Sequence, residues 1–257
     1  MKSALITGAT AGIGASFARL LASQGYDLIL VARDVDRLNA TAETLSKEFG
    51  VTCEVLPADL SKAKELTKVE NRLSESDRPV EVLINNAGFG IKSGFLTSEI
   101  SAEQQMLDVL VVAPMRLMHA VLPSMKSSNR GIIINVSSVA GWIAGGTYSA
   151  AKSYLTVLSE SLHAELVNSE VTVMALAPGF TRTEFHQRAN IYMKSLPEFM
   201  WITSDFLVAK AWENAQEGAA VSVPGWQYAI LSSIARFGPR PLVRTLGMNM
   251  RRKQRKK

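Results

Sequence analysis

Short apolar runs alternate with helical patterns along most of the chain, and this alternation constrains the fold more than any single motif does. Between the runs, apolar residues recur at helical spacing. Strands that alternate with helices at this pitch predict an α/β fold, a doubly wound parallel sheet with helices on both faces. We expect about seven strands, in the order 3-2-1-4-5-6-7. The runs are residues 2–7, 26–32, 51–56, 80–84, 131–136, 171–177 and 219–223.

Residues with binding or catalytic chemistry follow the strands directly. In an open α/β sheet, ligands bind beyond the carboxyl ends of the strands. The position that these residues share is therefore stronger evidence for a site than any one of them. They are the glycine turn from Gly8 to Gly14, Arg33, Asp59, Asn86, Ser138 and Pro178-Gly179.

The first of these motifs is a glycine turn between a strand and a helix. Gly8, Gly12 and Gly14 flank Thr10 and Ile13. Glycines let backbone N–H groups approach a pyrophosphate, and the N-terminus of the next helix favours an anion. The turn predicts a dinucleotide phosphate site, although an ordinary tight turn explains the glycines alone equally well.

The second strand ends at Arg33 instead of an acidic residue. A carboxylate at this position would bind a ribose 2′-hydroxyl, whereas an arginine suits a 2′-phosphate. We therefore favour NADP(H) over NAD, and the alternative for Arg33 is a solvated loop charge.

Tyr148 and Lys152 lie four residues apart, on one face of a predicted helix. A phenol has a pKa of roughly 10, which a nearby ammonium lowers. Such a pair can move a proton near neutral pH. Alone, the pair also fits a surface helix with one aromatic residue and one charge, so its meaning depends on the other motifs.

Together these motifs resemble the short-chain dehydrogenase/reductase family, in the same order and at similar spacing, over about residues 2–184. The resemblance implies a Rossmann fold and oxidoreductase activity. The matching segments are Thr7-Gly8-Ala9-Thr10-Ala11-Gly12-Ile13-Gly14, Asn85-Asn86-Ala87-Gly88, Ser138, Tyr148 with Lys152, and Pro178-Gly179.

The resemblance also implies a role for each site residue. Tyr148 is expected to be the general acid in ketone reduction, Lys152 to lower its pKa and bind the nicotinamide ribose, and Ser138 to hydrogen-bond the substrate oxygen. Thr183 is expected to hold the nicotinamide carboxamide. The remaining cofactor-binding residues are expected to be Asp59 and Leu60 at the adenine, Asn86, Ala87 and Gly88 along the groove, and Pro178, Gly179 and Thr181 beside the nicotinamide.

The chain departs from the family pattern in two places. Leu110 stands where members usually carry an asparagine that supports a water-mediated proton relay, and its side chain cannot hold a water. The span from Ser138 to Tyr148 is shorter than is common, which predicts an open, apolar substrate mouth. Trp142 in this span either touches substrate or packs on a lid or a neighbouring subunit.

Composition and length predict one large domain with an appended tail. We expect a single Rossmann-type domain over residues 1–225, with an apolar substrate lid over 185–217, and a basic amphipathic tail over 226–257. The single cysteine, Cys53, excludes an intrachain disulfide and suits a reducing compartment. We expect no signal peptide, no membrane span and a cytoplasmic location. No cluster of side chains has metal-ligand spacing, so we expect no metal.

The tail differs sharply in charge from the body. Residues 218–257 hold nine Lys/Arg and no Asp or Glu, so residues 1–217 hold the other 19 basic and all 23 acidic groups, a net of −4. An apolar helix with a basic flank fits peripheral contact with the inner face of a membrane. A helix packed on the body with a solvated end is the alternative. We expect no nucleic-acid binding, because the basic run has no reading motif.

These observations predict an NADP(H)-dependent oxidoreductase that transfers hydride between nicotinamide and a hydrophobic ketone or secondary alcohol. The family resemblance implies a homodimer or homotetramer. Two alternatives stay open: a cofactor-binding protein with little turnover, which Leu110 supports, and the same enzyme using NAD.

Overall fold

A computed structural model describes residues 2–185, 197–239, 241 and 243–245 of the chain. The strands are β1 (Ser3–Thr7), β2 (Asp27–Ala32), β3 (Cys53–Pro57), β4 (Val82–Asn85), β5 (Gly131–Val136), β6 (Val171–Leu176), β7 (Thr181–Arg182), β8 (Ile202–Thr203) and β9 (Val221–Ser222). The α-helices are α1 (Gly12–Ser23), α2 (Val35–Phe49), α3 (Ala63–Leu73), α4 (Ile100–Leu107), α5 (Ala113–Ser128), α6 (Thr147–Glu165), α8 (Ser204–Gln216) and α9 (Trp226–Phe237). The shorter helical turns are the π-helix η1 (Asp108–Val112) and the 3₁₀ turns η2 (Val139–Trp142) and η3 (Glu198–Met200).

Seven strands form one parallel sheet in the order β3-β2-β1-β4-β5-β6-β9. The predicted order is confirmed, because β9 is the seventh strand of this sheet along the chain. It is shorter than the predicted run 219–223, since only Val221 and Ser222 pair with β6. The short strands β7 and β8 pair separately, in a two-stranded parallel sheet that the sequence does not predict.

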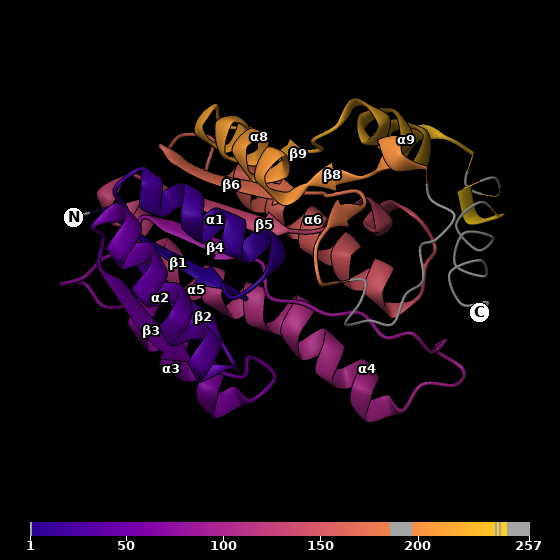
Figure 1. Ribbon diagram of the computed structural model, residues 1–257. Coiled ribbons are helices and arrows are strands. Elements are labelled where there is room, and N and C mark those ends of the chain that lie inside the picture. The colour runs from indigo at the N-terminus through magenta and orange to yellow at the C-terminus, as the bar shows by residue number, and fades with distance from the viewer. Residues whose placement is uncertain (1, 186–196, 240, 242, 246–257) are drawn as a thin grey trace.

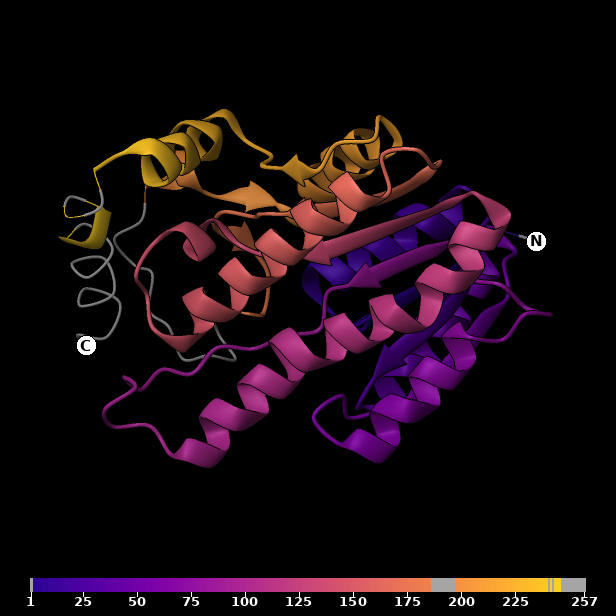
Figure 2. The same cartoon turned by 180° about the vertical axis from the view of Figure 1, so that it is seen from behind.

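Helices cover both faces of the sheet, as predicted (Figure 1). One apolar core cluster joins the sheet to α1, α2 and α8, and a second joins it to α3, α5 and α6. Seen from behind, α6 and the long helix made of α4, η1 and α5 lie in front of the sheet (Figure 2). The central strands are apolar along nearly their whole length because both of their faces are buried.

The long helix between β4 and β5 is interrupted, which the sequence does not predict. The π-helix η1 lies between α4 and α5 and contains Leu110. Such π turns occur mostly as single insertions inside α-helices, often at functional sites. By length and composition alone, residues 100–128 could cross a membrane. Met106, Leu117, Val121 and Met125 of this helix are nevertheless buried inside the fold, as in a core helix.

Helix α9, which opens the predicted tail, packs on the body through one face. Tyr228 is 1% exposed and belongs to the core cluster that contains α1 and α8. Gln227 Nε2 donates a hydrogen bond to Phe199 O at 3.1 Å, and Arg236 pairs with Glu160 of α6 at 3.2 Å. The division into a domain and a tail at residue 225 stays a prediction. The basic run that ends the chain lies outside the described residues.

A buried polar network fastens α6 to the sheet. Asn85 Nδ2 on β4 donates to Asn135 Oδ1 on β5 at 2.8 Å, and Asn135 Nδ2 donates to Ser159 Oγ on α6 at 2.8 Å. Asn135 is fully buried. Paired polar groups of this kind orient a helix more specifically than apolar packing does.

We expect Asn135→Ala to destabilise the protein by about 2–4 kcal/mol, because it leaves buried groups of Asn85 and Ser159 without their partner. Urea unfolding followed by circular dichroism measures this change. Asn39→Ala on the exposed side of α2 is the control and should shift the free energy of unfolding by less than about 0.5 kcal/mol. Equal effects of the two substitutions would contradict the role assigned to the network.

Candidate active site

The glycine turn between β1 and α1 has the geometry of a phosphate site. Gly8 and Gly12 adopt φ of +68° and +53°, which favour glycine. A Cβ on Gly8 would lie 2.8 Å from Asn86 Nδ2, so the turn must approach this loop closely. Helix α1 begins at Gly12 without a side-chain cap or an acidic residue in its first turn. Its first N–H groups are therefore available to an anion.

Thr7 holds the glycine turn and the Asn86 loop together. Its buried hydroxyl donates to Ile84 O at 3.2 Å and accepts from the backbone N–H groups of Asn86 and Ala87 at 2.9 and 3.0 Å. Asn86 Nδ2 donates in turn to Thr7 O and Gly8 O. The sequence motif contains Thr7 without indicating this role, and the signal for it is a hydroxyl residue at the end of the first buried strand.

The expected adenosine end of the groove brings together charged residues from β2 and β3. Arg33 is exposed directly after β2, near enough to Asp59 to lower the pKa of this carboxyl. Burial raises the pKa of Asp59, but hydrogen bonds from Ser61, with Arg33 and Lys62, bring it below its usual value. The side chain of Leu60 is buried in the core cluster that contains α3, so it does not lie free at the expected adenine site.

Arg37 also lies at this end, and the sequence analysis did not single it out. Its Nη2 atom donates to Thr10 O at 3.1 Å and pairs with Glu184 at 3.2 Å. The guanidinium thus reaches across the glycine turn from α2. Ile13 packs against the core on the other side of this turn. The signal for Arg37 is its place in the first turn of the helix that follows Arg33.

Ser138, Tyr148 and Lys152 meet at the carboxyl end of β5. Ser138 begins η2, accepts from Ala140 N at 3.1 Å and hydrogen-bonds the Tyr148 phenol. Lys152 Nζ lies 5.8 Å from the centre of the Tyr148 ring and donates to Val136 O at 2.6 Å. The structure therefore brings the three predicted catalytic residues together.

Neighbouring hydroxyls set the position of the Lys152 turn of α6. Ser137 Oγ donates to Lys152 O at 2.7 Å and lies 2.6 Å from Thr156 Oγ1. Both side chains are buried. Ser137 and Thr156 are further positioning residues that the sequence analysis did not identify, because contacts across the fold reveal them and local spacing does not.

Leu110 gives the surroundings of Tyr148 their apolar character. It is 1% exposed and clusters with Met106, Ala151 and the partly buried Tyr148. A Cβ on Gly88 would lie 2.8 Å from Leu110 Cδ2 and 3.9 Å from Lys152 Nζ, so Leu110 and Lys152 both lie close to Gly88.

Burial in this apolar setting shifts the pKa values of both Tyr148 and Lys152 so that each favours its uncharged form. Burial raises the pKa of Tyr148 to about 12, although the hydrogen bond from Ser138 lowers it. Burial also lowers the pKa of Lys152 to about 8. Burial thus acts against the lowering of the Tyr148 pKa that is expected from Lys152, and this lowering stays a prediction. The physical reason is that loss of water disfavours both charged forms.

The loop after β6 closes the other side of the site. Pro178 O accepts from Val139 N at 3.1 Å, which ties this loop to Ser138. Thr181 is buried, and its hydroxyl donates to Gly179 O at 3.1 Å, so its side chain serves the loop. Thr183 lies against the glycine turn, since a Cβ on Gly12 would be 2.9 Å from Thr183 Cβ.

The substrate side is apolar where the structure describes it. The ring centres of Tyr148 and Phe185 lie 6.1 Å apart. The predicted lid falls partly outside the described residues. Within the described part of the chain, no group of three His, Cys, Asp or Glu is placed to hold a metal ion, and the expected absence of a metal stays a prediction.

Known proteins share this sequence pattern and this fold. A family model for the short chain dehydrogenases matches residues 2–193. A short-chain dehydrogenase from Sphingobium yanoikuyae, solved in complex with NADPH, is 37% identical, with a TM-score of 0.84 over 91% of this chain and 93% of that one. An alcohol dehydrogenase from Comamonas testosteroni, described as specific for bulky-bulky ketones, is 33% identical, with a TM-score of 0.80 over 93% of each chain.

One relative of similar sequence has a name that states its reaction. The NADP-dependent 3-hydroxy acid dehydrogenase of Schizosaccharomyces pombe is 33% identical over 210 residues, which are 76% of this chain and 81% of that protein. Because the family model covers far more than half of the chain and the site carries the matching motifs, this protein belongs to the short-chain dehydrogenase/reductase family of oxidoreductases.

Proposed function

We propose that this oxidoreductase is an NADP(H)-dependent carbonyl reductase acting on a hydrophobic ketone and the corresponding secondary alcohol. The observation that carries the proposal is the meeting of Ser138, Tyr148 and Lys152 beside an uncapped glycine turn. The relatives support it, since one was solved with NADPH and another is described as acting on bulky ketones.

The residues present fit a dinucleotide. The N–H groups at the start of α1 suit its pyrophosphate, and Arg33 with Arg37 suits a 2′-phosphate. Asn86, Ala87 and Gly88 line the path from there to Lys152. When bound, the reduced nicotinamide supplies the hydride.

The protein's own groups handle the proton and the developing negative charge. Ser138 donates a hydrogen bond to the carbonyl oxygen, which stabilises charge that grows there during reduction. Tyr148 gives its proton to the same oxygen as general acid. A pKa of about 12 keeps the phenol protonated before the reaction, which suits reduction. The Lys152 ammonium favours the phenolate that remains.

The substrate class follows from the apolar surroundings of Tyr148. Phe185 lies beside the phenol, and Leu110 excludes water from beneath it. A substrate with apolar groups next to its carbonyl can pack against these apolar side chains. We further infer that the protein forms a homodimer or homotetramer and that it is located in the cytoplasm.

We expect Tyr148→Phe to lower kcat for ketone reduction by about 10²- to 10⁴-fold, because it removes the general acid. NADPH consumption against a panel of hydrophobic ketones measures this loss. Tyr154→Phe, on the exposed side of the same helix, is the control and should keep full activity. Undiminished turnover in Tyr148→Phe would remove the proposed mechanism. NADPH binding without turnover of any ketone by the wild type would favour the binding-protein alternative.

We expect Arg33→Ala to raise the Kd for NADPH by about tenfold or more while leaving the Kd for NADH unchanged, because only NADPH carries the 2′-phosphate. Fluorescence titration with both cofactors measures the two constants. The matched control is Arg130→Ala, whose guanidinium pairs with Glu81. If NADPH affinity does not change in Arg33→Ala, or NADH binds the wild type more tightly, the NAD-dependent alternative holds.

We expect Leu110→Asn to raise turnover at neutral pH several-fold, because an amide beside Lys152 can hold a relay water. It should also raise the pKa of Lys152 from about 8, since a polar neighbour stabilises the ammonium. The function that needs this ammonium is lost as pH rises through its pKa, so the alkaline limb of kcat/KM for NADPH should move to higher pH. Leu110→Ala is the control, because it opens space without adding a polar group. Identical pH profiles for the wild type and Leu110→Asn would show that Leu110 does not control Lys152.

A further inference from the structure

Helix α9 buries a mostly polar side against the body and exposes its apolar side. Its inward residues Gln227, Tyr228 and Ser232 are 8%, 1% and 5% exposed. An ordinary surface helix buries its apolar stripe and exposes its polar side. Here the apolar stripe points outward instead. We call the following residues the apolar face of α9: Trp226, Ile230, Leu231, Ile234 and Phe237, which are 70%, 53%, 45%, 49% and 82% exposed.

The contacts of the inward side keep the helix in this orientation. The Tyr228 hydroxyl donates to Met200 O, and its ring lies where a Cβ on Gly179 would otherwise project. On the flank, Arg236 stacks over the Trp142 ring at 5.4 Å and pairs with Glu160. Rotating α9 to bury its apolar face would break these contacts, so this face stays outward in the described fold.

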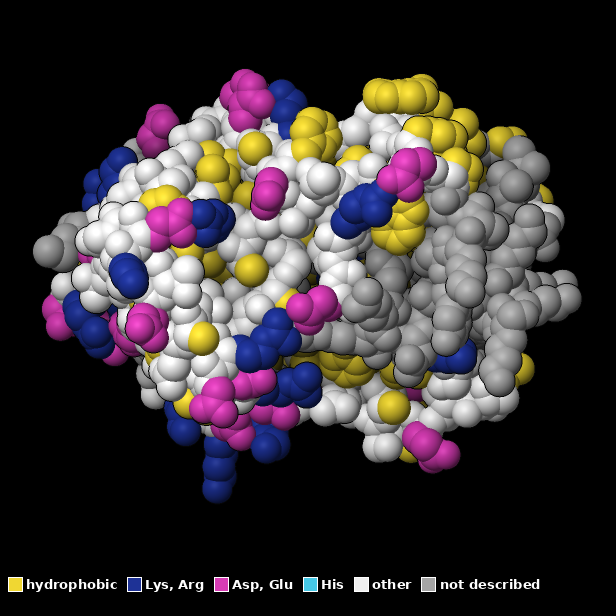
Figure 3. Space-filling view, in the orientation of Figure 1, with side chains coloured by type: hydrophobic (Ala, Val, Ile, Leu, Met, Phe, Trp, Pro, Cys, Tyr) yellow, Lys and Arg dark blue, Asp and Glu magenta, His cyan; other side chains and the backbone are white. Residues whose placement is uncertain are grey.

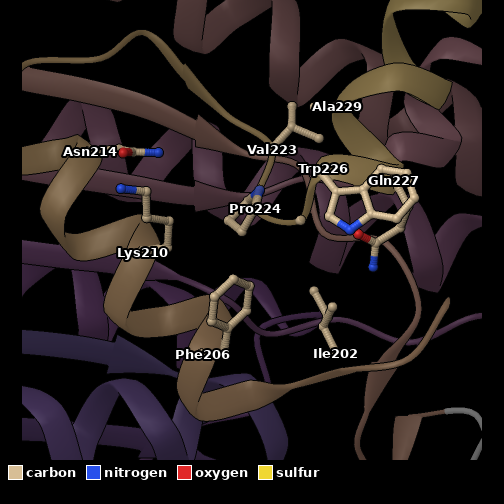
Figure 4. A pocket seen from close by; sticks show the side chains of 10 residues that line it. Ile202, Phe206, Lys210, Asn214, Val223, Pro224, Trp226, Gln227 and Ala229 are labelled. Atoms are coloured by element: carbon tan, nitrogen blue, oxygen red, sulfur yellow. The ribbon is translucent and has the colours of Figure 1, made fainter. Parts of the chain in front are cut away.

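The apolar surface continues beyond the helix itself. Hydrophobic side chains gather over α9 in the space-filling view (Figure 3). A groove of about 590 Å³ lies between α8 and the start of α9, with Trp226 and Phe206 on its two sides (Figure 4). Ile202, Val223 and Pro224 add to its lining. An apolar patch that extends over a helix and a groove marks an interaction site.

The charge of the surrounding sequence distinguishes between partners. Residues 218–257 contain nine Lys/Arg and no Asp or Glu. Two of these cations are Arg236 on α9 and the exposed Arg244. A second copy docked through the same face would bring two such basic segments together, because a two-fold contact places one surface against itself. Like charges would oppose this contact. Anionic lipid head groups complement the same charges instead.

We propose that the apolar face of α9 docks on the surface of a bilayer that contains anionic phospholipids. Trp226, Ile230, Ile234 and Phe237 enter the boundary between head groups and acyl chains, with the helix parallel to the membrane plane. The exposed Arg244 and the cations that follow it in the sequence supply the positive charge that attracts anionic head groups. Docking through α9 turns the side of the molecule that holds Trp142 and Tyr228 toward the membrane. The proposal is independent of the proposed function, because lipid binding requires no turnover.

Sedimentation of the full chain with vesicles of phosphatidylglycerol and phosphatidylcholine tests the proposal. We expect the wild type to bind these vesicles, to bind less as salt rises, and to bind vesicles of phosphatidylcholine alone much more weakly. Ile230→Ser with Ile234→Ser should lower the partition coefficient at least about tenfold. The matched control is Val157→Ser with Val167→Ser, two residues 62% and 75% exposed on and after α6, which should bind as the wild type does.

A shortened chain ending at residue 250 separates the charge from the apolar face. It lacks six of the nine cations and should bind anionic vesicles at least about tenfold more weakly. Undiminished binding by the Ile230/Ile234 variant, or no binding by the wild type, would overturn the proposal. So would a smaller sedimenting species for that variant in the absence of lipid, because the face would then be a contact between copies. NADPH affinity checks that each variant is folded.

Discussion

Burial of a parallel sheet on both of its faces is the constraint on which the rest of this structure depends. Parallel strands need a crossover after each strand, and the crossovers place helices on both faces. The carboxyl ends of all the strands therefore lie at one edge. Thr7, at the end of β1, uses this geometry to join the glycine turn to the Asn86 loop. The candidate site is thus assembled from the ends of several strands, with no element added for that purpose alone.

Tyr148 and Lys152, the candidate catalytic pair, show how packing sets pKa values at this edge. Lys152 is held by Val136 O and, like Leu110, lies close to Gly88. The same absence of water raises the pKa of Tyr148 and lowers that of Lys152. Burial therefore favours a protonated Tyr148 phenol and an uncharged Lys152 amine, which is the opposite of a phenolate next to an ammonium.

Helix α9 joins two surfaces with different purposes. Its inward side supports the loop that carries Gly179, through the Tyr228 ring, and holds Trp142 through Arg236. The structure places Trp142 against Arg236 of α9, which is neither the substrate contact nor the lid or subunit contact expected from the sequence. Its outward side is apolar, and the segment of sequence that contains it, residues 218–257, carries nine Lys/Arg and no Asp or Glu. The helix thus lies between the candidate active site and whatever surface covers its apolar face.

The sequence by itself determined the sheet order, the edge at which the site forms and the residues Ser138, Tyr148 and Lys152, because short-range patterns specify strands and turns and parallel topology does the rest. It also indicated Arg33 and the apolar stripe of α9. Only the tertiary structure decided that this stripe points outward, that η1 interrupts a long helix at Leu110, and that Arg37 crosses the glycine turn. Periodicity reports which residues share a helix face. Which neighbour that face meets depends on contacts between segments far apart in the chain, and burial and pKa depend on the same contacts.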